Sequence, residues 1–252
     1  MFREELAKPA LLFLLLFSAW QVLYVAESLL RLDHAVAYLM VLGSATCFFI
    51  LDHQKMSDLG LWRSPGWRAE AQAGFVLAVA LVLLKDAAAL ATSTDPPAIL
   101  QGILDFSRAA ALALTAGAVE EISFRGYILR KLAASHATAE AILLSSTLFA
   151  FYKLPLSLIL ETISFTPVLT FSSWGAFVLQ SFILGMVQSI LCTKTDGRTA
   201  GPWALNSASV FLSLLISFPL PPVQANLIGA AAAAVILIPV LRIKRESIRR
   251  TA

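Results

Sequence analysis

An all-α polytopic membrane protein, with about eight transmembrane helices in one bundle, is the fold that the sequence predicts. Apolar residues make up 58% of the 252 residues and charged residues only 14%, whereas soluble domains are near half apolar and a quarter charged. The apolar residues also fall into runs of roughly 20, the length that crosses a bilayer core of about 30 Å. Because the connections between runs are short, we expect a single membrane domain, 1–252, without a separate soluble domain.

The apolar runs, separated by charged or Pro/Gly-rich breaks, give the positions of the spans. We expect the spans near residues 9–30, 35–51, 70–92, 109–131, 137–152, 173–193, 201–217 and 223–241. The first run lacks a short apolar core followed by a small-residue cleavage site, so we expect it to stay as a span. The segment 154–171 is apolar but contains Pro155, Glu161 and Pro167. Its sequence leaves a loop, an interfacial helix and a re-entrant segment open.

The Lys and Arg residues indicate how the spans are oriented, because cytoplasmic connections are enriched in positive charge. With eight spans and the N-terminus inside, 15 of the 19 cations fall at or near the cytoplasmic face, and the exceptions are Arg31, Lys85, Arg108 and Lys153. Seven spans would put the Arg-rich tail, 242–250, outside. We therefore expect both termini in the cytoplasm. This topology, and not nucleic-acid binding, accounts for the net charge of +3 and the pI near 9.

The fourth predicted span contains ionisable residues, which are costly in a bilayer and are therefore candidates for function. They are Glu120, Glu121 and Arg125, in the run Ala118-Val-Glu-Glu-Ile-Ser-Phe-Arg-Gly126. On an α-helix Glu121 and Arg125 face one another, while Glu120 is turned about 100° away. This spacing predicts that Glu121 is paired and Glu120 is free. A free carboxylate in a dry setting is a candidate general base, and a structural polar clasp between helices is the alternative.

These residues resemble the first motif, EExxxR, of the CPBP family of intramembrane glutamic proteases, which includes CAAX prenyl proteases and bacteriocin-processing proteins. The run from Phe149 to Lys153 is similar to the second motif of the family, FxxxH, and the run from Asn206 to Val210 occupies the place of the third, HxxxN. The resemblance covers roughly residues 100–215. Lys153 and Asn206 stand where the family has histidine, and Val210 stands where the third motif ends in Asn or Asp.

The resemblance implies a role for each matching residue. In the family, the first glutamate and the second-motif histidine activate a water, and the third-motif residues hold the oxyanion. By position, Glu120 would be the base, with Glu121 and Arg125 as its support. An ammonium on Lys153 would make Glu120 a weaker base, whereas the amide of Asn206 could donate to an oxyanion. The alternatives are that Lys153 extends to the outer interface and that Asn206 only forms a bond between helices.

Three functions are consistent with these residues. The first is an intramembrane glutamic-type endopeptidase, which processes a membrane-associated protein or peptide with a water activated by Glu120. The second is a catalytically inactive homologue that acts as a membrane binding or regulatory scaffold, and the loss of both histidines favours it. The third is a proton-coupled transporter with Glu120, Lys85 and Asp86 as a relay, but no internal repeat is visible in the sequence.

We expect no cofactor and no metal. Cys47 and Cys192 lie in apolar runs without metal-ligand spacing, and Lys153 would oppose a bound cation. The expected partners are membrane lipid and a membrane-anchored protein or peptide, and the resemblance implies an integral protein of a bacterial inner (plasma) membrane. Lys85 and Asp86 are adjacent and do not face one another on a helix, so we expect each to neutralise a group on a neighbouring helix.

Overall fold

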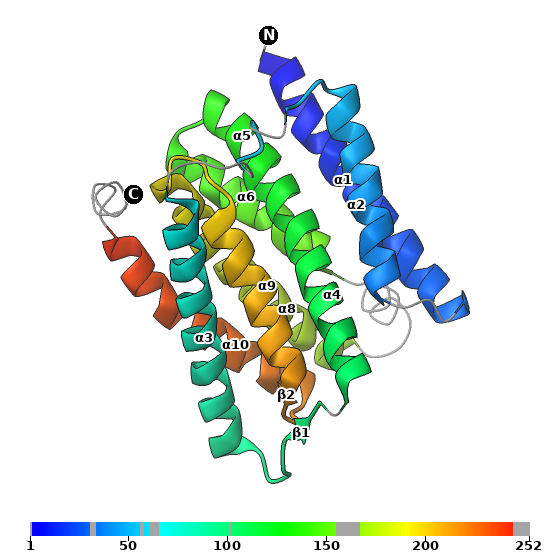
Figure 1. Ribbon diagram of the computed structural model, residues 1–252, viewed down its shortest axis with the longest axis vertical. Coiled ribbons are helices and arrows are strands. Elements are labelled where there is room, and N and C mark those ends of the chain that lie inside the picture. Colours follow the sequence, from blue (N-terminus) through cyan, green and yellow to red (C-terminus); the bar gives the residue numbers. More distant parts are fainter. Residues whose placement is uncertain are drawn as a thin grey trace.

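The structure, a computed structural model, is a bundle of long helices (Figure 1). It describes residues 2–30, 34–55, 58–60, 66–100, 102–154 and 167–243. Its elements in chain order are α1 (Phe2–Leu30), α2 (His34–Leu51), α3 (Trp67–Thr92), β1 (Ala98–Ile99), α4 (Ile103–Glu120), η1 (Glu121–Ile128), α5 (Leu129–Ser135), α6 (Thr138–Tyr152), α8 (Pro167–Lys194), α9 (Ala200–Leu215), β2 (Ile216–Ser217) and α10 (Pro222–Arg242).

A helix lies at each of the eight predicted positions in the described part of the chain, and α4, η1 and α5 follow one another without a break. The all-helical prediction is therefore confirmed, apart from the two short strands. Most of the segment 154–171, whose structure the sequence leaves open, lies outside the described residues, and Pro167 begins α8.

Some of the described helices have the composition of membrane-spanning helices. Among the described residues, three are long and apolar enough to cross a membrane: Trp67–Thr92, Trp174–Lys194 and Pro222–Arg242. Three apolar helices are shorter: Ala7–Val22, Tyr38–Leu51 and Thr138–Tyr152. Large apolar side chains such as Leu51 and Leu83 are exposed on the helix surfaces, as suits contact with lipid. The crossing of the bilayer by all eight helices, and the side on which the termini lie, stay predictions.

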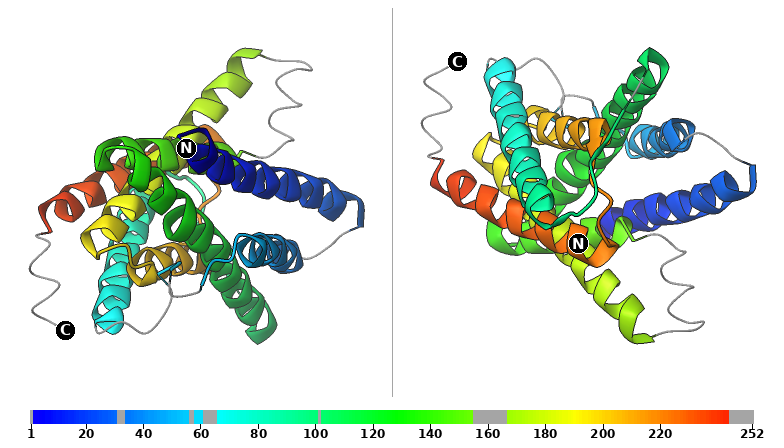
Figure 2. Two further views of the ribbon diagram at one scale, coloured as in Figure 1. Left: turned by 90° about the horizontal axis from the view of Figure 1, so that it is seen from above. Right: turned by 90° about the horizontal axis from the view of Figure 1, so that it is seen from below.

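The helices pack around two apolar cores. One core is formed by α1, α2, the α4–η1–α5 stack and α6, and the other by α3, α8, α9 and α10. All three views show the α1–α2 pair on one side of the central helices and α10 on the other (Figures 1 and 2). Helices α3 and α9 approach very closely, since a Cβ atom at Gly74 would lie 2.0 Å from the carbonyl oxygen of Gly201. Small residues allow such close helix contact in membrane proteins.

The two strands form an antiparallel ribbon, with Ala98 opposite Ser217 and Ile99 opposite Ile216. The ribbon lies at the end of the bundle opposite to the start of α1 (Figure 1). It joins the extended chain after α3 to the extended chain after α9 and so holds these two connections together.

Charged side chains connect the helices at the end of the bundle where α1 begins. Asp52, directly after α2, accepts hydrogen bonds from Lys8 of α1 and, at 2.8 Å, from the hydroxyl of Tyr127. Burial by itself raises the pKa of Asp52, but these two hydrogen bonds and the charge of Lys8 together hold it below its ordinary value of 3.8. Arg198, between α8 and α9, pairs with Glu70 of α3. The two pairs fix the order of the helices at this end.

Candidate functional site

The two neighbouring glutamates lie where the helix changes type. Helix α4 ends at Glu120, and η1, which begins at Glu121, is a π-helix in which every residue is buried. A π-helix has more residues in each turn than an α-helix, is rare, and occurs frequently at functional sites. The glutamates therefore lie at the junction of the two helix types, and the carboxylates of both reach the same residue, Asn206 of α9.

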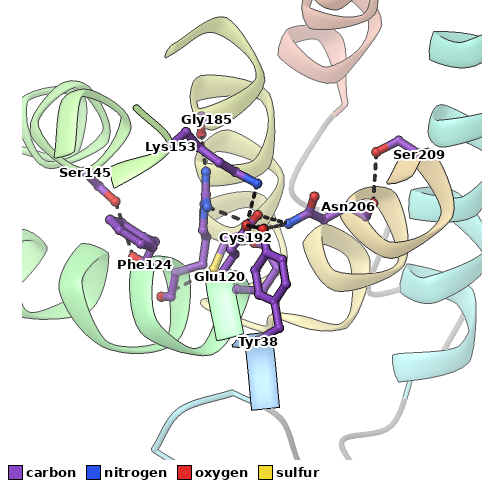
Figure 3. A network of polar contacts seen from close by, with 11 residues as sticks. Tyr38, Glu120, Phe124, Ser145, Lys153, Gly185, Cys192, Asn206 and Ser209 are labelled. Atoms are coloured by element: carbon purple, nitrogen blue, oxygen red, sulfur yellow. Dashed lines mark hydrogen bonds and ion pairs between the residues drawn. The ribbon is translucent and has the colours of Figure 1, made fainter. Parts of the chain in front are cut away.

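Glu120 is fully buried and contacts side chains of three other helical segments (Figure 3). The ammonium of Lys153 and the hydroxyl of Tyr38, the latter at 3.4 Å, donate to Oε1, and Asn206 Nδ2 donates to Oε2 at 2.8 Å. The prediction that Glu120 is free is therefore wrong. Its cationic partner follows α6 and lies far from it in the sequence, so the spacing within one helix could not indicate the pair. Lys153 contacts Glu120, so the alternative that its side chain extends to the outer interface is also wrong.

Glu121 and Arg125 form the ion pair that their spacing predicts, with 3.4 Å between Arg125 Nη1 and Glu121 Oε1. Arg125 is fully buried, donates from Nη2 to the carbonyl oxygen of Gly185 in α8 at 3.2 Å, and lies 4.2 Å from the centre of the Phe149 ring. Asn206 Nδ2 donates to Glu121 Oε1 at 3.1 Å. These contacts hold η1 against α6, α8 and α9, and so fix the position of the glutamates.

Two residues from the first two helices also support the site, and no motif in the sequence identifies them. Tyr38 of α2 contacts Glu120, and its ring lies 4.6 Å from the ring of Trp20 in α1. Gln21 of α1 donates to the carbonyl oxygen of Leu154 at 2.7 Å. This bond fixes the chain directly after Lys153. Single polar side chains within long apolar runs carry no motif, so only the packing of helices reveals their role.

A cavity of about 330 Å³ lies beside the glutamates. Lys153 and Asn206 line it, together with Val210, the residue at the end of the third motif. Glu120 does not line the cavity. A molecule in the cavity would therefore meet Lys153 and Asn206 first, with the Glu120 carboxylate directly behind them.

The contacts of Lys85 and Asp86 do not match the prediction that each residue neutralises a group on a neighbouring helix. Lys85 Nζ donates to the hydroxyl of Ser213 at 2.9 Å, which is a neutral partner. Asp86 Oδ1 is buried and has no hydrogen-bond partner among the described residues. Both residues line a second cavity of about 200 Å³. The polar contacts of α9 explain the difference, because this helix offers Lys85 a hydroxyl and no carboxylate.

No three His, Cys, Asp or Glu side chains in the described ranges gather where they could hold a metal ion. The mechanism without a metal stays a prediction from the donor types. Glu120 pairs with Lys153, Glu121 pairs with Arg125, and Asn206 donates to both carboxylates.

The fold and the site together define a helical membrane protein with an ionisable site enclosed by its helices. Residues 102–212 match the family Type II CAAX prenyl endopeptidase Rce1-like. This match confirms the resemblance to a family of membrane endopeptidases that the motifs predict, and it includes Glu120, Glu121, Arg125, Lys153 and Asn206. No curated protein matches the chain. Helices α1, α2, α3 and α10 lie outside the matched residues.

Proposed function

We propose that the chain is an intramembrane endopeptidase of the glutamic type, which cleaves a membrane-associated protein or peptide with a water activated by Glu120. The family match supports the endopeptidase class. The glutamic mechanism is supported most directly by one observation: the buried carboxylate of Glu120 lies directly behind Lys153 and Asn206, two hydrogen-bond donors that line a cavity of about 330 Å³.

In the proposed reaction, the Glu120 carboxylate accepts a proton from a water molecule. The water oxygen bonds to the carbonyl carbon of the peptide, and the carbonyl oxygen becomes an oxyanion. When the oxyanion collapses to a carbonyl, the bond between carbon and nitrogen breaks. Glu120 then returns the proton to the departing amine nitrogen, so that the carboxylate is restored.

Lys153 is the donor that we propose for the oxyanion. An ammonium has three N–H donors, and the described contacts of Lys153 with oxygen use one of them, on Glu120. The side chain is 22% exposed and lines the cavity, where a peptide carbonyl would lie. Asn206 is a weaker candidate, because its Nδ2 already donates to both Glu120 and Glu121. A positive charge fixed beside a developing oxyanion lowers the barrier of the reaction.

A second candidate function is a scaffold that binds a membrane peptide or lipid without cleaving it. One observation favours it: both carboxylate oxygens of Glu120 have partners, and Glu120 is fully buried behind Lys153. In this function the ion pair and the hydrogen bond from Asn206 only hold α4, α6 and α9 together. The two functions differ in whether the carboxylate of Glu120 is needed for a chemical step.

The experiment that separates them maps new peptide termini. The purified protein is reconstituted with membrane proteins of its own host, and new termini are identified by mass spectrometry for the wild type, Glu120→Gln and Glu140→Gln. Glu140 is an exposed residue at the start of α6 and serves as the matched control. The proposal predicts termini with the wild type and with Glu140→Gln but not with folded Glu120→Gln. Termini that persist in Glu120→Gln would exclude the glutamic mechanism, and the absence of any wild-type terminus would favour the scaffold.

A further inference from the structure

Lys85 of α3 is a half-buried lysine that makes no direct ion pair with a described residue, although the charge of Asp86, which lines the smaller cavity with it, acts on it through space. Its ammonium donates to the Ser213 hydroxyl at 2.9 Å. Asp86 is next to it in the chain, but neighbouring side chains diverge by about 100° around a helix. Removal of a charge from water is costly unless an opposite charge compensates for it. The surroundings of Lys85 therefore favour an anionic ligand.

Lys85 lies where the two cavities meet. Three polar residues, Lys85, Gln180 and Ser213, line both the cavity of about 330 Å³ and the cavity of about 200 Å³. The first cavity also contains Lys153 and Asn206, whereas the second is lined by residues of the β2 strand. The three polar residues thus line two cavities, one beside β2 at the end of the bundle with the ribbon (Figure 1) and one beside Lys153 and Asn206.

Gln180 of α8 adds a second donor at this position. Its amide makes no hydrogen bond with the described residues, and it packs against α10 at Gly229. A Cβ atom at Gly229 would lie 2.5 Å from Gln180 Nε2, so the glycine leaves the room that this side chain occupies. An ammonium with N–H groups to spare, an amide and a hydroxyl are together a donor set for the two oxygens of a carboxylate.

We propose that Lys85, Gln180 and Ser213 form a subsite for a carboxylate of the bound peptide; this rests on the proposed function, in which the neighbouring site cleaves a peptide. Asn206 and Ser213 are seven residues apart on α9, which corresponds to about 10 Å along the helix. The carboxylate is an acidic side chain or the free carboxyl end of the peptide. Lys85 lies outside residues 102–212, so the family match does not include this subsite.

Binding of synthetic peptides tests the subsite. One series is apolar, acetylated and amidated, with a single Asp moved along the chain, and a matched series has Asn in its place. A third peptide has neither but ends in a free carboxylate. Each is labelled with a fluorophore, and its Kd for the purified wild-type protein is measured in the cold by fluorescence anisotropy, with mass spectrometry to verify that it stays intact.

We expect the peptide with its carboxylate at one particular position to bind about tenfold more tightly than the matched peptide without that charge. We expect Lys85→Gln to abolish this difference in Kd. Lys55→Gln, a change of an exposed lysine outside both cavities, should retain it. Lys85→Glu should instead favour a peptide with Lys at that position, a gain that a misfolded protein would not give. Tighter binding of an Asp peptide would identify an acidic side chain as the source of the carboxylate, and tighter binding of the third peptide would identify the free carboxyl end.

Equal Kd values for the charged and uncharged peptides, or a preference that survives in folded Lys85→Gln, would overturn the subsite. The outcome is independent of cleavage. A Lys85-dependent preference, together with no Glu120-dependent terminus in the reconstitution experiment, would support the subsite and refute the proposed function, whereas Glu120-dependent termini without such a preference would do the reverse.

Discussion

The ion pair between Lys153 and Glu120 makes the stability of the bundle depend on a lysine where the family has histidine. Lys153→Met keeps a long side chain and removes the ammonium, so that Glu120 retains only Tyr38 and Asn206 as donors. Breaking a buried ion pair costs about 3–5 kcal/mol. Because the Lys153 side chain is 22% exposed and two donors remain, we expect a loss of about 3 kcal/mol in the free energy of unfolding.

A second substitution should recover most of this loss. In Lys153→Met with Glu120→Gln, the buried charge without a counter-ion is gone, and Asn206 can still donate to the amide oxygen. We expect the double variant to be about 2 kcal/mol more stable than Lys153→Met alone, so the two changes are strongly non-additive.

Thermal unfolding followed by tryptophan fluorescence in one detergent measures these differences. For a chain of this size, about 3 kcal/mol corresponds to a decrease in Tm of roughly 6–12 °C. Lys55→Met, at an exposed position, is the control for loss of a lysine. A Tm of Lys153→Met equal to that of the control, or a double variant whose loss is the sum of the single losses, would refute the coupling of the two residues.

The remaining predictions concern the packing and the end of the bundle where α1 begins. Gly74→Ala should cost about 3 kcal/mol of stability, because its Cβ would lie 2.0 Å from the carbonyl oxygen of Gly201 and the two helices would have to separate. Gly43→Ala, with nothing within 4 Å of the new atom, should be neutral or slightly stabilising, and equal Tm changes for the two variants would argue against the close contact. Asp52 has a lowered pKa, so its pair with Lys8 stabilises the fold above pH 3.8 and this contribution is lost as the pH falls below that value. We expect the stability difference between the wild type and Asp52→Asn, about 1 kcal/mol near neutral pH, to shrink as the pH falls below 3.8; a difference that stays constant with pH would contradict this role of the pair.

The positions of the helices could be predicted from the sequence because the apolar runs and the charged breaks between them are long and clear. The structure differs from the prediction where the conformation of a segment depends on residues distant in the sequence. The π-helix from Glu121 to Ile128 depends on the fit of this segment against the helices around it, and its sequence has no periodicity that indicates it. The ribbon of two-residue strands pairs Ala98 with Ser217, which no short-range pattern connects.

The site could be predicted in part. The Glu121–Arg125 pair follows from spacing within one helix, and the EExxxR motif identified the segment. The partners of Glu120 could not be predicted in this way, because Lys153 and Tyr38 come from other helices and no rule of spacing joins them to it. The same reason applies to Lys85. Its charge was visible in the sequence, but its neutral partner and its place between two cavities depend on the packing of α3 against α9.

The central claim is that the Glu120 carboxylate takes part in cleavage of a peptide bond. The most direct measurement is the initial rate at which one mapped peptide terminus appears, determined by quantitative mass spectrometry for the reconstituted wild type and for Glu120→Gln at equal amounts of folded protein. Loss of a general base predicts a rate lower by about 10²- to 10⁴-fold in Glu120→Gln. A rate that stays at the wild-type value would contradict the claim.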